Sequence, residues 1–202
     1  MDRSNQFKAM VSVNCQSGYL QGKILIANPH IGDSRFERAL VFVCTHDIGQ
    51  AMGIVINHPM QGLIVKEVFE QLDIGEVREP LASQCVLTGG PVSQDRGFVI
   101  HTRDVPYGPE TINVNETYAV SATQEILQCL VSNQPPSASL FALGYAGWES
   151  GQLENEIHEN AWLVCDADRK LLFDQDYTDK WTNALSTLGV SPQYLSTSFG
   201  HT

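Results

Sequence analysis

Positive charge is scarce in this sequence and is nowhere clustered. The 202 residues include 12 Lys and Arg against 23 Asp and Glu, which gives a formal net charge of −11. A protein that binds nucleic acid without sequence preference needs clustered cations to neutralise phosphates, and an anionic membrane surface attracts the same clusters. The composition therefore disfavours direct nucleic-acid binding and membrane binding.

Long apolar runs and paired cysteines are also missing. No segment approaches the length that spans a bilayer, and the first 20 residues contain no apolar stretch followed by a small-residue cleavage site. We therefore expect a cytoplasmic protein. The five cysteines fit reduced, mostly buried thiols, because their number is odd and no two have the CxxC spacing of zinc ribbons and thioredoxin-type sites. They are Cys15, Cys44, Cys85, Cys129 and Cys165.

The motifs of common enzymes and cofactor sites do not occur. The chain has no GxSxG, no Walker A loop and no GxGxxG after a predicted strand. Glu154 and His158 stand one helical turn apart and could share a cation, but a dinuclear helical site needs a second Glu-x-x-His and a zincin needs a second His. We interpret them as a solvated helical pair and assign no metal and no cofactor.

The order of predicted elements indicates an α+β fold. After a polar lead at 1–18, β-branched and apolar runs predict strands at 23–28, 37–46, 52–57, 84–89, 97–102, 116–123, 138–147 and 161–168. Apolar stripes predict helices at 65–72, 123–132 and 181–188. No linker divides residues 19–202, so we expect one domain there.

The segment GYAGWESGQLENEIHENAW, residues 144–162, is predicted to turn sharply out of a strand between Gly144 and Gly147. A helix then begins near residue 150 or 151 and docks through Leu153 and Ile157, while its glutamates mostly point elsewhere. The tryptophans at the two ends are expected to anchor the core.

Two stretches carry candidate chemistry. In Cys44-Thr45-His46, strand alternation places the thiol and the imidazole on one face about 6.6 Å apart, either as nucleophile and base or as core beside Phe42. In TGGPVSQDRGF, residues 88–98, two glycines could turn N–H groups toward an anion near Arg96; alternatively, the stretch is a shaped loop in which Asp95 and Arg96 pair.

These motifs together resemble the AlgH/YqgE family of bacterial proteins. The resemblance rests on ILIANPHIGDSRFERALVFVCTHDIGQAMGIVINHP, LTGGPVSQDRGFVIH and LGYAGWESGQLENEIHENAWLV, and it runs from Tyr19 to the last predicted helix. It implies a strongly bent, barrel-like mixed sheet with several helices around it, in a cytoplasmic protein. The family name implies a part in transcriptional regulation but no reaction.

We therefore expect a non-catalytic regulatory protein that binds a small anionic or nucleotide-like ligand or a protein partner. The candidate binding residues match family positions and lie in turns and amides: Asn57, Gly89, Gly90, Asp95, Arg96, Tyr145 and Trp148. The alternative is a thiol-dependent enzyme or redox sensor that uses Cys44 with His46 as its base. A DNA-binding regulator is suggested by the family name and opposed by the charge. The sequence leaves the oligomeric state open.

Overall fold

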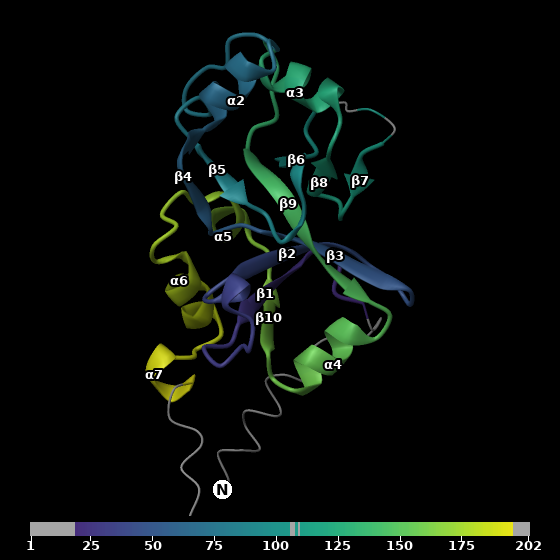
Figure 1. Ribbon diagram of the computed structural model, residues 1–202, viewed down its shortest axis with the longest axis vertical. Helices are drawn as coiled ribbons and strands as arrows, with labels where there is room; N and C mark the ends of the chain where they lie inside the picture. Colours follow the sequence, from purple (N-terminus) through teal and green to yellow (C-terminus); the bar gives the residue numbers. More distant parts are fainter. Residues whose placement is uncertain (1–18, 106–107, 109, 196–202) are drawn as a thin grey trace, which may run out of the picture.

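The computed structural model describes residues 19–105, 108 and 110–195, and it has an α+β fold built on one curled sheet (Figure 1). The strands are β1 (Lys23–Ala27), β2 (Leu40–His46), β3 (Gln50–Val55), β4 (Pro59–Ile64), β5 (Cys85–Thr88), β6 (Val92–Thr102), β7 (Ile112–Asn113), β8 (Tyr118–Ser121), β9 (Ser139–Glu149) and β10 (Trp162–Asp166). The helices are the 3-10 helix η1 (Ser34–Phe36), α2 (Val65–Gln71), α3 (Gln124–Leu130), α4 (Gln152–His158), α5 (Arg169–Phe173), α6 (Lys180–Thr187) and α7 (Pro192–Leu195). The predicted α+β fold with a bent, barrel-like sheet is confirmed.

The long strand β9 joins the two halves of the molecule, and in Figure 1 it runs diagonally from the upper part to the lower part. The sheet order is β10-β1-β2-β3-β9-β6-β8-β7, with β4 and β5 attached at the side. The first half of β9 pairs antiparallel with β6 and parallel with β5, whereas its last four residues pair antiparallel with β3. Because β9 changes partners along its length, the sheet curls into a half-barrel.

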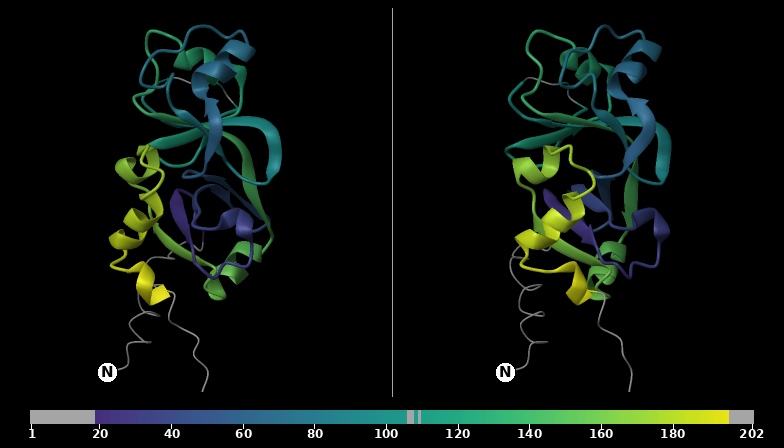
Figure 2. Two further views of the ribbon diagram at one scale, coloured as in Figure 1. Left: turned by 60° about the vertical axis from the view of Figure 1, so that its left-hand side comes forward. Right: turned by 90° about the vertical axis from the view of Figure 1, so that its left-hand side faces the viewer.

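Three apolar clusters fill the spaces on either side of the sheet. The central core lies between the sheet and α5 and α6, and Phe42 and Ile54 belong to it. The α4 core lies on the opposite face of β2 and β3 and includes Val41 and Leu153. The upper core packs α2 and α3 against β5, β6 and β9. Figure 2 shows the C-terminal helices on one side of the lower sheet and α4 on another.

One cationic side chain lies inside the central core. Lys180, on the first turn of α6, is 1% exposed. Its Nζ donates hydrogen bonds of 3.0 Å to the carbonyl oxygens of Ile56 and Leu172, and it stands 5.5 Å from the ring centroid of Tyr177. Burial lowers the pKa of Lys180 to about 7.

Several predicted boundaries need correction. The sharp turn expected between Gly144 and Gly147 is wrong: β9 continues to Glu149, and Gly144, with a φ of +76°, makes only a local irregularity in it. The chain turns instead at Gly151, whose φ of +73° places the left-handed residue directly before α4. In the predicted stripe of α2, Leu72 follows the helix and is 54% exposed.

The loop expected before residue 97 is also different, because β6 already begins at Val92. Its register with β9 moves from Val92 opposite Tyr145 to Gly97 opposite Leu143, so three extra β6 residues are accommodated there. The predicted polar lead at 1–18 lies outside the described residues, and the single domain at 19–202 stays a prediction. Among the described helices, none is long and apolar enough to cross a bilayer.

Candidate functional site

A β-bulge in β2 separates the two residues of the predicted thiol site. The pairing of β2 with β3 shifts between Val43 and Thr45, so Cys44 is the additional residue. Cys44 faces the central core, Thr45 lies toward that same side, and His46 turns to the face that α4 covers. The prediction that Cys44 and His46 share one face is therefore wrong, because the extra residue reverses the alternation.

The two side chains also have separate environments. Cys44 is fully buried, its Sγ lies 3.4 Å from the carbonyl oxygen of Phe42, and burial raises the pKa of its thiol. His46 accepts a hydrogen bond of 2.9 Å at Nδ1 from the N–H of Leu20. Its proton is therefore on Nε2, which lies 2.9 Å from Oε1 of Glu154. Because both ring nitrogens are engaged elsewhere, His46 is not placed to act as a base for Cys44.

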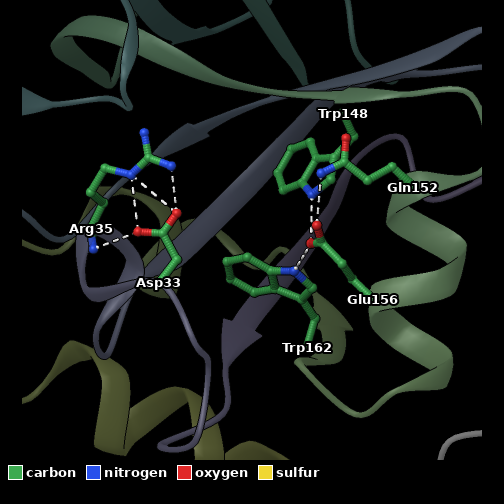
Figure 3. Close-up of polar contacts among 6 residues, drawn as sticks. All are labelled: Asp33, Arg35, Trp148, Gln152, Glu156 and Trp162. Atoms are coloured by element: carbon green, nitrogen blue, oxygen red, sulfur yellow. Dashed lines mark hydrogen bonds and ion pairs between the residues drawn. The ribbon is translucent and has the colours of Figure 1, made fainter.

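Helix α4 carries a polar arrangement that the sequence reasoning missed. Oε2 of Glu156 accepts hydrogen bonds from the indole N–H groups of Trp148, at 2.8 Å, and Trp162, at 2.7 Å (Figure 3). Gln152 donates to the other carboxylate oxygen at 2.9 Å. Both indoles are buried, as expected of core anchors, and they meet edge to face. Glu156 thus holds the two indoles in place. The tryptophans themselves indicate such a residue in the sequence, because a buried indole N–H needs a hydrogen-bond acceptor.

The predicted pair of Glu154 and His158 does not describe α4 correctly. Glu154 engages His46 on β2, which connects the helix to the sheet, and His158 is exposed. Within the described ranges, no three His, Cys, Asp or Glu side chains gather closely enough to hold a metal ion.

Gly89 and Gly90 serve the packing of the sheet. The N–H of Gly89 donates to the carbonyl oxygen of Leu143 at 2.7 Å, so the prediction that it faces an anion is wrong. A Cβ at Gly89 would lie 2.3 Å from the carbonyl oxygen of Gly144, and one at Gly90 would lie 2.1 Å from the carbonyl carbon of Tyr145. Only glycine allows this close approach of two chain segments.

Three further candidates separate into structural and surface positions. Asn57 is buried and joins two main-chain groups, since its Oδ1 accepts from the N–H of Leu40 and its Nδ2 donates to the carbonyl oxygen of Arg38. Asp95 and Arg96 are both exposed. The guanidinium of Arg96 lies over the ring of Phe98, 5.3 Å from its centroid, and no ion pair joins it to Asp95.

A pocket opens where the central core reaches the surface between the two halves of the curled sheet, and we call it the half-barrel mouth. Its volume is about 550 Å³. One bank comes from β2, β3 and the end of β9, and the other from β6, β7 and β8. The lining residues are Thr45, Gln50, Ala51, Met52, Val92, Arg96, Phe98, Glu110, Ile112, Val120, Ala122, Tyr145, Gly147, Trp148 and Glu149.

The lining of the mouth combines an apolar floor with a few charges. Most of the apolar lining belongs to, or packs against, the central core. Arg96 supplies a cation, whereas Glu110 and Glu149 supply carboxylates. Of the predicted binding residues, Arg96, Tyr145 and Trp148 are brought together here, while Asn57, Gly89, Gly90 and Asp95 do not line the pocket. Apolar concavities with few polar groups are the usual form of small-molecule sites.

A family model described as AlgH-like matches residues 24–193 of the chain. Relatives include a UPF0301 protein of Caulobacter vibrioides, which is 45% identical over 90% of this chain and 93% of its own length. A UPF0301 protein of Bradyrhizobium diazoefficiens is 43% identical over 92% of this chain and 89% of its own length.

Two solved structures share this fold. The solution structure of the AlgH protein from Pseudomonas aeruginosa is similar with a TM-score of 0.72 and 38% identity, covering 94% of this chain and 99% of that one. A crystal structure of a protein from Corynebacterium diphtheriae has a TM-score of 0.68 at 19% identity, covering 88% and 92%, which is a likeness of fold alone.

Proposed function

We start from the fact that this chain belongs to the AlgH-like family, and we propose that it is a non-catalytic binding protein whose half-barrel mouth receives a small ligand with an anionic group and an apolar body. The observation that carries this proposal is the pocket of about 550 Å³ with Arg96 at its edge and a floor continuous with the central core. A regulatory role, including one in transcription, would follow from this binding.

The apolar body of the ligand would extend the central core outward. Phe98 and Tyr145 meet edge to face, with ring centroids 5.7 Å apart, and both line the mouth. Met52 and Ile112 also line it and pack against the same core. Covering this surface removes apolar area from water, which favours binding by roughly 25 cal/mol per Å².

The anionic group would meet Arg96. The guanidinium is exposed and is held over Phe98, so its N–H donors are preorganised beside the apolar floor. A guanidinium presents a planar fork of donors that matches a carboxylate or phosphate. The net charge of the protein is −11 and Glu110 and Glu149 also line the mouth, so Arg96 supplies the positive charge that an anion would contact there.

The positions of Cys44 and His46 support binding over the thiol-enzyme alternative. Cys44 is buried and does not line the mouth, and His46 is engaged by Leu20 and Glu154. A nucleophilic cysteine needs access and a lowered pKa, whereas burial raises the pKa of Cys44.

A thermal-shift screen of anionic metabolites with an apolar part tests the proposal, followed by calorimetric titration of each hit. Arg96→Gln should weaken a hit roughly tenfold to 100-fold, because a hydrogen bond to a charged group contributes about 1.5–3 kcal/mol. Arg78→Gln is the matched control, since Arg78 is exposed and lies outside the mouth. No stabilising anion, or hits that bind the Arg96 variant equally well, would overturn the proposal.

A further inference from the structure

We infer that the ligand of the half-barrel mouth carries a secondary amide beside a carboxylate, and that the residue bearing both groups pairs with the main chain of Gly147 as one residue of an added strand. The chemical class is an N-acyl amino acid or the carboxyl terminus of a polypeptide. The inference rests on the proposed function, since it names the ligand of the same site.

Two hydrogen bonds show to which side of β3 the main-chain N–H and C=O groups of each residue point. The N–H of Ile56 donates to the carbonyl oxygen of Leu40, toward β2, at 2.9 Å. The N–H of Val55 donates to the carbonyl oxygen of Gly89, on the opposite side, at 2.8 Å. Main-chain polar groups alternate in direction along a strand. The N–H and C=O groups of the odd-numbered β3 residues therefore point toward β9.

The same alternation shows to which side the N–H and C=O groups of each β9 residue point. Ala146 and Trp148 stand opposite odd-numbered β3 residues, so they exchange hydrogen bonds with β3. The N–H and C=O of Gly147 consequently point away from β3. Glu149 agrees with this alternation, because its N–H is directed to the side chain of Gln152, which accepts it at 3.0 Å.

Gly147 thus presents an open strand edge inside the mouth. On the side away from β3, the pairing of β9 with β6 ends at Tyr145, and across residues 19–105, 108 and 110–195 no strand is paired with Gly147 there. Gly147 is exposed, lines the pocket and has no side chain to cover its own main chain. One donor and one acceptor on a single residue match one residue of an antiparallel partner: the amide N–H of the ligand would donate to the C=O of Gly147, and the N–H of Gly147 would donate to the carboxylate oxygen of the same ligand residue.

The side chains around Gly147 select the rest of the ligand. Met52 is directly opposite Gly147 on β3, and Tyr145 is two residues away on the same face, so an apolar side chain fits between them. The guanidinium of Arg96 would pair with one carboxylate. Glu110 and Glu149 line the same pocket and repel additional negative charge, which favours a monoanion over a polyphosphate.

The unmodified protein tests the inference with three probes and titration by NMR. N-acetyl-L-phenylalanine contains the amide and the carboxylate, 3-phenylpropanoate lacks the amide, and N-acetyl-N-methyl-L-phenylalanine lacks only the amide N–H. We expect the first to bind roughly fivefold more tightly than either of the others, because both lack the N–H that would donate to the C=O of Gly147. A hexapeptide ending in phenylalanine distinguishes the sources: tighter binding than the single residue indicates a polypeptide terminus, and equal binding indicates a free N-acyl amino acid.

A pair of variants tests the role of Gly147 directly. Gly147→Pro removes an N–H that is not part of the β3 pairing and should weaken binding of N-acetyl-L-phenylalanine roughly tenfold, because the carboxylate oxygen of the ligand loses its main-chain donor. Gly147→Ala keeps the N–H and should retain the affinity, because its Cβ would have only an ordinary contact, at 3.4 Å, with the ring of Tyr145. The three probes decide the question with wild-type protein even where the proline variant fails to fold.

The outcomes separate this inference from the proposed function. Equal affinity for N-acetyl-L-phenylalanine and 3-phenylpropanoate, with both dependent on Arg96, would overturn the inference and leave the anion-binding proposal standing. Absence of binding by every probe at millimolar concentration, together with an empty metabolite screen, would overturn both.

Discussion

The buried amine of Lys180 makes the stability of the fold depend on pH in a predictable direction. Burial lowers the pKa of this side chain from its ordinary 10.5 to about 7. The unfolded chain therefore binds a proton below pH 10.5 that the folded chain takes up only near pH 7. Unfolding absorbs protons between these values, so the free energy of unfolding rises with pH through this window.

The magnitude follows from the difference between the two pKa values. They differ by about 3.5, and each pKa unit corresponds to about 1.4 kcal/mol, so the full span is about 5 kcal/mol. Roughly 2 kcal/mol of this span falls between pH 7 and pH 9. Lys180 is only 1% exposed, so solvent screening reduces the effect little.

The assay is urea unfolding of the wild type and Lys180→Met at several pH values from 7 to 9. The free energy of unfolding of the wild type should rise by roughly 2 kcal/mol more than that of the variant across this range. The absolute stability of the variant is less informative, because methionine leaves the carbonyl oxygens of Ile56 and Leu172 without their donor. The difference in pH dependence between the two proteins isolates the amine.

Lys66→Met is the matched control, since Lys66 is an exposed lysine on α2. Its free energy of unfolding, plotted against pH, should run parallel to that of the wild type. If the curve of Lys180→Met is parallel as well, Lys180 is charged in the fold, and the two carbonyl oxygens and the Tyr177 ring compensate for its burial. That result would refute the reasoning.

One alkylation experiment and two substitutions test other parts of the structure. Native-state alkylation followed by mass spectrometry should modify Cys85, which is partly exposed, well before Cys44, which is fully buried; faster modification of Cys44 would contradict its assigned position. Glu156→Gln should lower the free energy of unfolding by about 1–2 kcal/mol in urea titrations, because a charged acceptor of two indole N–H groups is lost, whereas Glu159→Gln at the exposed end of α4 should change it little. Gly90→Ala should cost more than about 3 kcal/mol or prevent folding, since its Cβ would clash with main-chain atoms of β9, and a thermal melt within a few degrees of the wild type would show that the two segments can separate.

The sequence predicted most elements because their signals are local. The apolar run at 40–46 and the stripe of Val65 and Phe69 form a strand and a helix as their residue patterns indicate. The extent of β9 was missed because glycines usually mark turns. Here Gly144 makes a local irregularity, and the neighbouring segment at Gly89 and Gly90 approaches closely enough to keep the strand in the sheet.

The site was less predictable, because it depends on contacts between distant parts of the chain. The bulge at Cys44 is set by the pairing of β2 with β3, and no local pattern revealed it. Arg96, Tyr145 and Trp148 were named from the sequence and do line the mouth. Gly147 was read only as a turn residue, since its open edge exists only where β6 leaves β9.

The central position of β9 has a consequence for synthesis of the chain on the ribosome. β3, β5 and β6 emerge first, but all three depend on β9, whose residues 139–149 come some 40 to 100 positions later. Until that strand emerges, the nascent protein exposes strand edges that have no partner, and such edges favour association between chains. A chain truncated before β9 should therefore aggregate, and one extended through β10 should be the first to acquire resistance to proteolysis.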